Sequence, residues 1–364
     1  MGGHLPPCVA SARRGVLAAL AGWSADGCPG SGVEDDDASA GAAPHVLLAV
    51  SGGADSLALA AAAAFLASTA QVEACALIVD HGLQAGSAEA AATAAEQVRG
   101  LGLSARVVEA QIADPGTEEQ AREARYAALE AAARRWEEES SRPVAILTGH
   151  TLSDQAEQVL LGLARGSGTR ALAGIPAARG RILRPFLGGA PGTEDGVWRA
   201  DTEAICAHAG LTPWQDPTNA ERVAARNRIR LDVLPYLEST LGPGVDAALA
   251  RTARLAAADA DYLDAEASRA YGELVLTGTD AVVLRLEGVR ALAAPLRRRV
   301  LRQAALAAGG LSPTYERTVA LERLCAAGGS AGPVQLAGHV EAFRVRDGAA
   351  YGHRAPVLVL RAAR

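Results

Sequence analysis

Between residues 45 and 165, short apolar runs alternate with segments of helical character, and this alternation restricts the fold more than any other feature of the chain. The apolar runs are HVLLAV (45–50), ACALIVD (74–80), ARVVEA (105–110) and VAILTGH (144–150). Helical segments follow them at about 57–68, 87–100, 117–138 and 153–165. Because the runs lack the polar alternation of a half-exposed strand, both faces of the sheet must be covered. We therefore predict a doubly wound parallel sheet in an α/β domain, with right-handed crossovers.

The whole chain is predicted to have three parts. A leader helix and a flexible insertion rich in Gly, Ser and Asp occupy residues 1–44. The α/β domain spans 45–238 and ends in a stretch that contains Pro and Gly. Residues 239–364 carry helical patterns followed by a β-like alternation, so we expect a mainly helical domain that ends in a β-hairpin.

Composition excludes several classes of protein. All 35 basic residues are Arg, so a Walker phosphate loop and Schiff-base chemistry, which need a Lys amine, are excluded. No apolar run approaches the ~20 residues that cross a bilayer, so we expect no membrane partner. The five Cys form no C-x-x-C pair, which excludes a disulfide framework and a zinc or iron–sulfur ligand set and favours a reducing cytoplasm.

The segment SGGADS (51–56) lies between the first predicted strand and its helix. Its two glycines let the backbone approach a ligand, and the helix start directs N–H groups and the helix dipole at the same point. This arrangement suits a pyrophosphate group. Asp55 fits beside phosphate only with a cation between them, so we predict a Mg²⁺ contact there. The predicted nucleotide-binding residues are Ser51, Gly52, Gly53, Ala54, Asp55 and Ser56, with His81 at the end of the second strand.

SGGADS resembles the SGG-x-DS phosphate loop of the PP-loop ATP pyrophosphatases, which split ATP between the α and β phosphates and transfer adenylate to a substrate oxygen. Further segments, in chain order, resemble the tRNA(Ile)-lysidine synthetases. These segments are VDHGLQ (79–84), AREARYAAL (121–129), GHTLSDQAEQVLLGLARGSGTRALAGI (149–175), RPFL (184–187), DPTN (216–219) and RNRIRLDVLP (226–235). The resemblance covers residues 45–240 closely and continues more weakly to RRRVLRQAA (297–305).

The resemblance implies a ligase that acts in two steps. ATP first adenylates O2 of the wobble cytidine in an isoleucine tRNA with a CAU anticodon. The ε-amine of free L-lysine then attacks C2 and displaces AMP. Adenylation comes first because a carbonyl oxygen on a pyrimidine is a very poor leaving group. ATP and Mg²⁺ are the implied cofactors, and the sequence leaves the oligomeric state open, with a homodimer among the arrangements it allows.

His150, Asp154 and Glu157 are spaced to share one face of a helix that begins at the carboxyl end of the fourth strand. Such a face could hold Mg²⁺ through Asp154, or accept a proton from the lysine ammonium, or pair with its charge. A solvated helix edge is the alternative. The resemblance adds Arg125 and Arg226 to the predicted catalytic set, although Arg125 lies on a Glu-rich helix where a surface ion-pair lattice is equally expected.

The net charge of −6 argues against a generally basic nucleic-acid coat, yet the Arg residues are clustered locally. Clusters of this kind are what contacts with a phosphate backbone need. A solvated charged face is again the alternative. The predicted tRNA-binding residues are Arg165, Arg170, Arg184, Arg226, Arg230 and Arg298.

Three other functions remain as alternatives. A PP-loop sulfur transferase would need a catalytic Cys, and none of Cys75, Cys206 and Cys325 lies at a suitable place. An amidotransferase-type synthetase would need a glutaminase domain, which the sequence does not show. A nucleotide-sensing or tRNA-binding module without catalysis would be expected to lack some of the acidic and His residues that are intact here.

Overall fold

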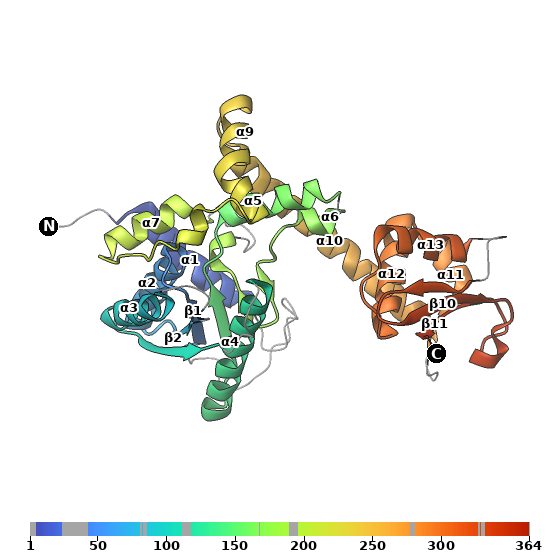
Figure 1. The fold of residues 1–364 in the computed structure, drawn as a ribbon. Helices are drawn as coiled ribbons and strands as arrows, with labels where there is room; N and C mark the ends of the chain where they lie inside the picture. Colours follow the sequence, from blue (N-terminus) through green and yellow to red (C-terminus); the bar gives the residue numbers. More distant parts are fainter. Residues whose placement is uncertain are drawn as a thin grey trace. The chain divides into compact units, whose positions relative to one another are not determined.

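The computed structural model describes residues 5–23, 43–80, 82, 86–110, 118–166, 168–188, 196–276, 281–326, 328 and 332–363 (Figure 1). The chain forms two compact units, residues 1–257 and 258–364. Their boundary lies within the long helix α10 (Val245–Leu274), whereas the boundary predicted from the sequence, 238/239, lies within α9 (Leu234–Leu241). The predicted insertion falls almost entirely on residues 24–42, outside the described residues.

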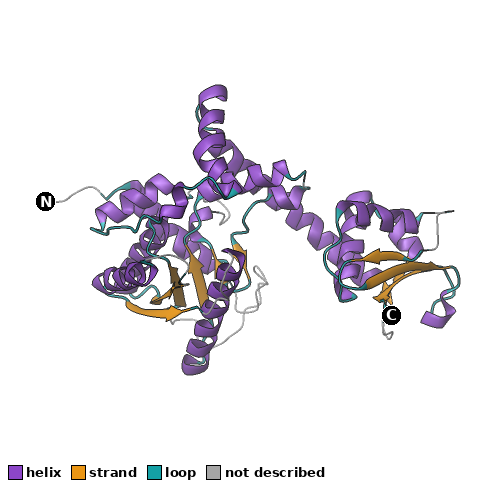
Figure 2. Ribbon diagram, viewed as in Figure 1, coloured by secondary structure: helices purple, strands orange, loops and turns teal. Residues whose placement is uncertain are grey.

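The first unit contains a six-stranded sheet in the order β3-β2-β1-β4-β6-β5. All its pairings are parallel except that of the edge strand β5 with β6. The strands are β1 (His45–Val50), β2 (Glu73–Asp80), β3 (Ser104–Glu109), β4 (Val144–Thr148), β5 (Ala178–Arg179) and β6 (Ile182–Leu183). The predicted parallel sheet with helices on both faces is confirmed (Figure 2).

Helices cover both faces of this sheet because successive β1 side chains point in opposite directions. Val46, Leu48 and Val50 pack into the core beneath α1 and α2, whereas Leu47 packs into a second core with Leu129 of α4. The helices of this unit are α1 (Pro7–Ala21), α2 (Ala54–Ser68), α3 (Ser87–Gly100), α4 (Glu118–Ser140), α5 (Leu152–Ala164), α6 (Thr169–Leu172), α7 (Arg199–His208), α8 (Ala225–Arg228), α9 and the first part of α10. Short 3₁₀ turns, Pro185–Leu187 and Pro217–Ala220, and a π-helical turn, Ile229–Val233, connect them.

The helix α2 is apolar around nearly its whole circumference, and such a helix must be enclosed on every side. The sheet covers one side, and α1 and α7 pack against others. Its many Ala residues let these neighbours approach closely. The leader helix therefore forms part of the core of the first unit, with Ala12 and Val16 fully buried.

The carboxyl ends of β1 and β4 converge on the first turn of α2. A Cβ atom on Gly149, directly after β4, would lie 2.7 Å from the backbone oxygen of Asp55. Contacts this short force neighbouring backbone to move. Gly149 is therefore a steric requirement of the fold at this point.

We expect Gly149→Ala to lower the free energy of unfolding by about 1–3 kcal/mol, because the displaced atoms are backbone rather than a flexible side chain. Gly100→Ala is the matched control, since nothing lies within 4 Å of the added atom at the end of α3. Denaturant unfolding should show the control unchanged or slightly stabilised. Equal stability of the two variants would contradict the steric assignment.

The second unit packs helices on one face of a five-stranded antiparallel sheet, in the order β7-β8-β11-β10-β9. Its strands are β7 (Val275–Leu276), β8 (Val282–Arg285), β9 (Val334–Leu336), β10 (Val340–Val345) and β11 (Val357–Ala362). Its helices are the end of α10, α11 (Leu286–Ala291), α12 (Ala294–Ala307) and α13 (Tyr315–Cys325), with a 3₁₀ turn at Gly348–Tyr351. The helical content and the terminal β-structure were predicted, and the hairpin is one part of this larger sheet. Among the described residues, none of the helices combines the length and apolar character that a bilayer crossing needs.

Candidate active site

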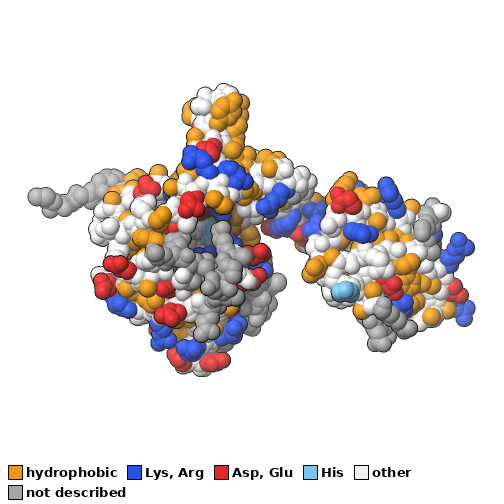
Figure 3. Space-filling model, in the orientation of Figure 1, with side chains coloured by type: hydrophobic (Ala, Val, Ile, Leu, Met, Phe, Trp, Pro, Cys, Tyr) orange, Lys and Arg blue, Asp and Glu red, His pale blue; other side chains and the backbone are white. Residues whose placement is uncertain are grey.

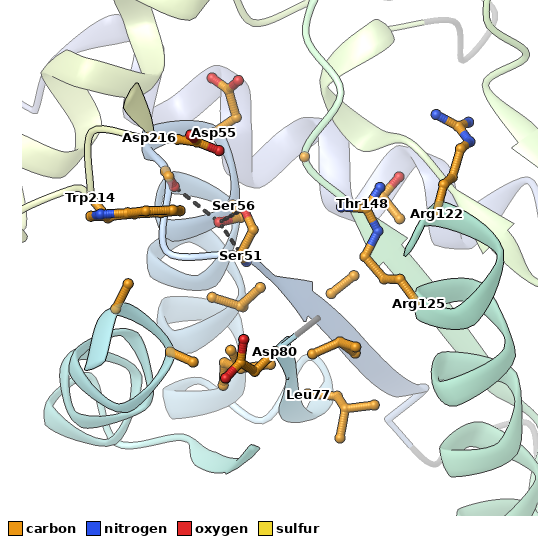
Figure 4. Close-up of a pocket in the computed structure, with 18 of the residues that line it drawn as sticks. Ser51, Asp55, Ser56, Leu77, Asp80, Arg122, Arg125, Thr148, Trp214 and Asp216 are labelled. Atoms are coloured by element: carbon orange, nitrogen blue, oxygen red, sulfur yellow. Dashed lines mark hydrogen bonds between the residues drawn. The ribbon is translucent and has the colours of Figure 1, made fainter. Parts of the chain in front are cut away.

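A cavity of about 400 Å³ lies at the carboxyl edge of the six-stranded sheet (Figure 4). Its walls come from the β1–α2 loop, the ends of β2 and β4, the helices α3 and α4, and the segment 214–226. The polar side chains that line it include those of Ser51, Asp55, Ser56, Asp80, Arg122, Arg125, His150, Asp154, Asp216, Asn219 and Arg226. The structure thus brings together side chains that lie as far apart in the sequence as residues 51 and 226.

The β1–α2 loop has the geometry of an anion-binding turn. Gly52 adopts a φ of +86°, which residues with a side chain rarely do, and its carbonyl accepts a hydrogen bond from Trp214 N at 2.9 Å. Ser56 Oγ accepts from Ser51 N at 3.1 Å and donates to Gly53 O at 3.0 Å. The helix α2 starts after Gly53 without a side-chain cap, so its first N–H groups can bind a phosphate. Gly52 and Ala54 belong to the same turn but do not line the cavity.

Asp55, in the first turn of α2, is one of the residues that line the cavity. Its Oδ1 accepts a hydrogen bond of 2.6 Å from Thr202 Oγ1 of α7. Burial raises the pKa of Asp55 to about 6, although the hydrogen bond from Thr202 acts in the opposite direction. The nearby carboxylates of Asp154 and Glu157 also raise it. With this pKa, the Asp55 carboxyl group changes its protonation state at a pH only slightly below neutral.

Asp154 and Glu157 form a closed network with two arginines. Glu157, with 1% of its side chain exposed, accepts from Arg199 Nη1 at 3.0 Å and from Arg226 Nε at 2.7 Å. Asp154 Oδ1 accepts from Nη2 of the same two arginines, at 3.0 Å each. Burial alone would raise the pKa of Asp154, but Arg226 and Arg199 outweigh it and hold the pKa below its ordinary value. Each of these buried carboxylates is thus paired with both guanidinium groups, as buried carboxylates require.

The remaining oxygen of Asp154 is also engaged. Oδ2 accepts from Thr151 N at 2.6 Å and from Thr151 Oγ1 at 3.0 Å, in the capping box that starts α5. A metal ion would have to displace one of these donors, so Asp154 fits poorly as the Mg²⁺ ligand predicted from the sequence. Asp55 fits better, because it lines the cavity in the first turn of α2, directly after the anion-binding turn. The described residues contain no cluster of three or more metal-ligating side chains.

His150 is an uncharged group in this cavity at neutral pH. Its Nδ1 lies 3.0 Å from Thr148 Oγ1 at the end of β4. Burial, together with the guanidinium of Arg184, lowers the pKa of His150 to about 4. The imidazole can therefore accept a hydrogen bond through one ring nitrogen at pH 7.

The low pKa of His150 predicts a specific acid sensitivity. As the pH falls through about 6.5 the unfolded chain binds the proton first, so the stability present above that pH is lost towards pH 4. In His150→Asn this loss should disappear, and the stability difference between wild type and variant should shrink by about 2–3 kcal/mol between pH 7.5 and 4.5. The opposing titration of Asp55 is common to both proteins and cancels. Parallel pH profiles of unfolding would refute the neutral state of His150.

Several residues of the site, including the following four, were not predicted as site residues from the sequence. Trp214 and Tyr126 line the cavity, and Arg199 and Thr202 contact its carboxylates from α7. No local motif marks Trp214, Arg199 or Thr202, which lie where the strand–helix rhythm has faded, whereas Tyr126 lies within AREARYAAL but was not singled out. Figure 4 shows Trp214 beside the anion-binding turn and Arg122 and Arg125, from α4, on the other side of the cavity.

Two known protein families match this chain, one in each of its two compact units. Residues 36–237 match the PP-loop domain family, and residues 284–351 match the TilS substrate binding domain. The chain is 47% identical over 296 residues to a tRNA(Ile)-lysidine synthase of Leifsonia xyli subsp. xyli, covering 80% of this chain and 85% of the relative. It is 45% identical over 329 residues to a tRNA(Ile)-lysidine synthase of Nocardia farcinica, covering 90% and 92%. Among solved structures, the U34-tRNA thiolase NcsA from Methanococcus maripaludis aligns with a TM-score of 0.47 and 17% identity, over 69% of this chain and 80% of that one.

The identity to these relatives extends over most of both chains. The chain belongs to the tRNA(Ile)-lysidine synthase family. Membership confirms the resemblance seen in the sequence and its PP-loop domain, and PP-loop enzymes use ATP.

The arginines predicted for tRNA binding lie in different environments. Arg165 and Arg170 are exposed after α5. Arg230 donates to Asn227 Oδ1 at 3.1 Å, and Arg298 pairs with Glu322 at 2.9 Å in the second unit. Arg184 is buried, with 5% exposed, and donates to Pro176 O at 2.8 Å, so it does not fit the tRNA-binding role predicted from the sequence. His81 lies outside the described residues.

Proposed function

We propose that this cavity ligates L-lysine to the wobble cytidine of an isoleucine tRNA with a CAU anticodon. The cytidine O2 attacks the α-phosphorus of ATP, the bond to the β-phosphate breaks, and pyrophosphate leaves. The lysine Nζ then attacks C2, the C2–O2 bond breaks, and AMP carries the oxygen away while Nζ loses a proton. The observation that carries this proposal is the single cavity that joins an anion-binding turn to a second set of acidic and imidazole groups.

The first step needs a site for pyrophosphate. Ser51, Ser56 and the start of α2 supply donors that suit the β and γ phosphates. Mg²⁺ bound there would neutralise phosphate charge, and Asp55 is the residue that would hold it, because Mg²⁺ typically takes one or two carboxylates and several phosphate oxygens. Arg122 and Arg125, which also line the cavity, are suited to further phosphate contacts.

The second step needs a lysine amine that can lose a proton. His150 is uncharged and lines the same cavity, so it can accept a hydrogen bond from the amine. Because its low pKa makes His150 a weak base, we assign it the role of orienting the lysine amine instead of deprotonating it. Asp154 also lines the cavity, but a lysine ammonium that pairs with it would have to displace one of the donors from Arg199, Arg226 or Thr151 that occupy its oxygens.

Binding of tRNA should rely on locally clustered arginines. We assign the positioning of the tRNA to residues 239–364 together with Arg165, Arg170, Arg226 and Arg230, and we place the enzyme in the cytoplasm, where its substrates are. In the view of Figure 3, basic side chains are interspersed with acidic ones on each of the two units, in keeping with the net charge of −6. A homodimer is compatible with this scheme, and sedimentation of the purified protein would test it.

We expect the affinity for tRNA to fall steeply with salt, because each arginine–phosphate contact releases condensed counterions. Five or more contacts would lower the affinity by roughly 10²-fold or more between 50 and 200 mM salt. Filter binding at a series of salt concentrations measures the slope. An affinity that stays constant over this range would contradict binding through arginine clusters.

The proposed reaction is tested by incubating the protein with ATP, Mg²⁺, labelled lysine and either of two isoleucine tRNAs, with a CAU or a GAU anticodon. Label in the CAU species alone is the expected result. Pyrophosphate release without lysine incorporation would keep the ATP chemistry but require another nucleophile.

Base thiolation by a related PP-loop enzyme is the alternative, and it calls for a reactive thiol. Burial raises the pKa of Cys75 to about 11 and that of Cys206 to about 12. Burial also raises the pKa of Cys325, in the second unit, to about 11. Thiols with such values are poor nucleophiles at neutral pH, so these three cysteines favour the ligase.

A further inference from the structure

The start of α7 contacts both halves of the proposed site without lining the cavity itself. Its Thr202 reaches Asp55 in the first turn of α2, and its Arg199 reaches Asp154 and Glu157 on α5. Neither Thr202 nor Arg199 is among the described residues that form the cavity wall. One short helix segment therefore connects carboxylates that lie about 100 residues apart in the sequence.

Thr202 is held rigidly enough to fix Asp55. Its side chain is fully buried, and its Oγ1 lies 2.6 Å from Asp55 Oδ1 and 2.7 Å from the backbone oxygen of Arg199. One turn further along α7, Cys206 Sγ donates to Ala54 O at 3.3 Å, so the helix contacts the first turn of α2 at two points. The hydrogen bond from Thr202 restrains the orientation of the Asp55 carboxylate, and Asp55 lines the cavity.

Arg199 contacts the carboxylates of Asp154 and Glu157 but is not among the described residues that line the cavity. Its guanidinium donates to Glu157 Oε1 and Asp154 Oδ1, and its backbone N–H donates to Ser153 Oγ at 3.3 Å. Arg226 makes the matching contacts from the cavity side. Arg226 can thus meet a substrate while Arg199 keeps the two carboxylates in place.

We propose that α7 is the positioning element of the site: Thr202 orients Asp55, Arg199 orients Asp154 and Glu157, and the helix between them sets the distance from the ATP subsite to the lysine subsite. This inference rests on the proposed function. It assigns Thr202 and Arg199 an effect on chemistry that acts only through the carboxylates they touch.

The test compares Thr202→Val with Thr202→Ser in ATP–pyrophosphate exchange, with CAU-anticodon tRNA present and lysine omitted. Val keeps the shape but loses the donor to a charged group, so exchange should slow about 10- to 100-fold. Ser keeps the hydroxyl and should stay within about threefold of wild type. A role in packing alone predicts the reverse order, because Ser loses a buried methyl group and Val does not. Thermal unfolding of both variants serves as the readout of folding.

Arg199→Lys tests the other end of α7 in the complete reaction. A lysine ammonium keeps the charge but lacks the planar fork that spans two carboxylates, so lysine transfer should slow about tenfold or more. Wild-type rates in both Thr202→Val and Arg199→Lys would overturn the positioning role, provided that the wild type itself is active. Inactivity of the wild type would instead overturn the proposed function.

Discussion

Replacing Asp55 with Asn is expected to abolish adenylation and at the same time to stabilise the folded protein. Asp55 lines the cavity next to the phosphate-binding turn, and the loss of a charge that acts in the transition state typically costs at least about 10²-fold in rate. The stability effect has a separate cause. Burial raises the pKa of Asp55 to about 6, so the folded state holds this proton more tightly than the unfolded state, and the ionised form is disfavoured by folding.

The sign of this effect gives a pH test. Between about pH 4 and 6 the folded state binds more protons at Asp55, so wild-type stability contributed by this residue falls as the pH rises through that window. Above pH 6 the whole of this destabilisation is present. The free energy of unfolding of Asp55→Asn should then exceed that of the wild type by on the order of 1–3 kcal/mol. Pyrophosphate exchange and denaturant unfolding at pH 7.5 measure both parts. A variant that keeps its activity, or that loses stability, would contradict this assignment.

Replacing Arg226 with Met is the second change with a large expected effect. Arg226 donates to buried Glu157 at 2.7 Å and to Asp154 at 3.0 Å, and it lines the cavity. Removing one partner of a buried ion pair is strongly destabilising, and with Arg199 still in place we expect a loss of about 2–4 kcal/mol. Because both carboxylates are then held from one side only, lysine transfer should fall by about 10²-fold.

Arg134→Met is the matched control for Arg226→Met. Arg134 is 59% exposed and pairs with Glu130 one turn away on α4 at 3.9 Å. Exposed pairs of this kind contribute about 1 kcal/mol or less, so both activity and stability should stay near wild type. The assignment fails if the two variants behave alike in unfolding and in lysine transfer.

The parts of the site that a local pattern encodes were predictable. SGGADS lies between an apolar run and a helix, and the turn, its positive-φ Gly52 and the capless start of α2 follow from those few residues. The spacing of His150 and Asp154 likewise places both at the carboxyl end of β4, and the structure brings both to the cavity. Local spacing suffices where the chemistry sits within one turn of a strand end.

The parts that depend on packing between distant segments were not predictable. Thr202 contacts Asp55 across 147 positions, and Arg199 contacts Asp154 across 45, with no periodicity that links them. Arg184, in RPFL, was predicted to contact tRNA as an exposed charge. In the structure its side chain is buried and donates a hydrogen bond to Pro176 O. Charge patterns in a sequence do not show which face of a loop is turned inward.

The two-step account is tested most directly by following the α-phosphate of ATP. With α-labelled ATP, Mg²⁺ and CAU-anticodon tRNA but no lysine, label should become attached to the tRNA, and it should leave as AMP when lysine is added. A GAU-anticodon tRNA should take up none. Label found on lysine, with an unlabelled tRNA, would contradict the account, because lysine would then be the adenylated substrate instead of the nucleophile.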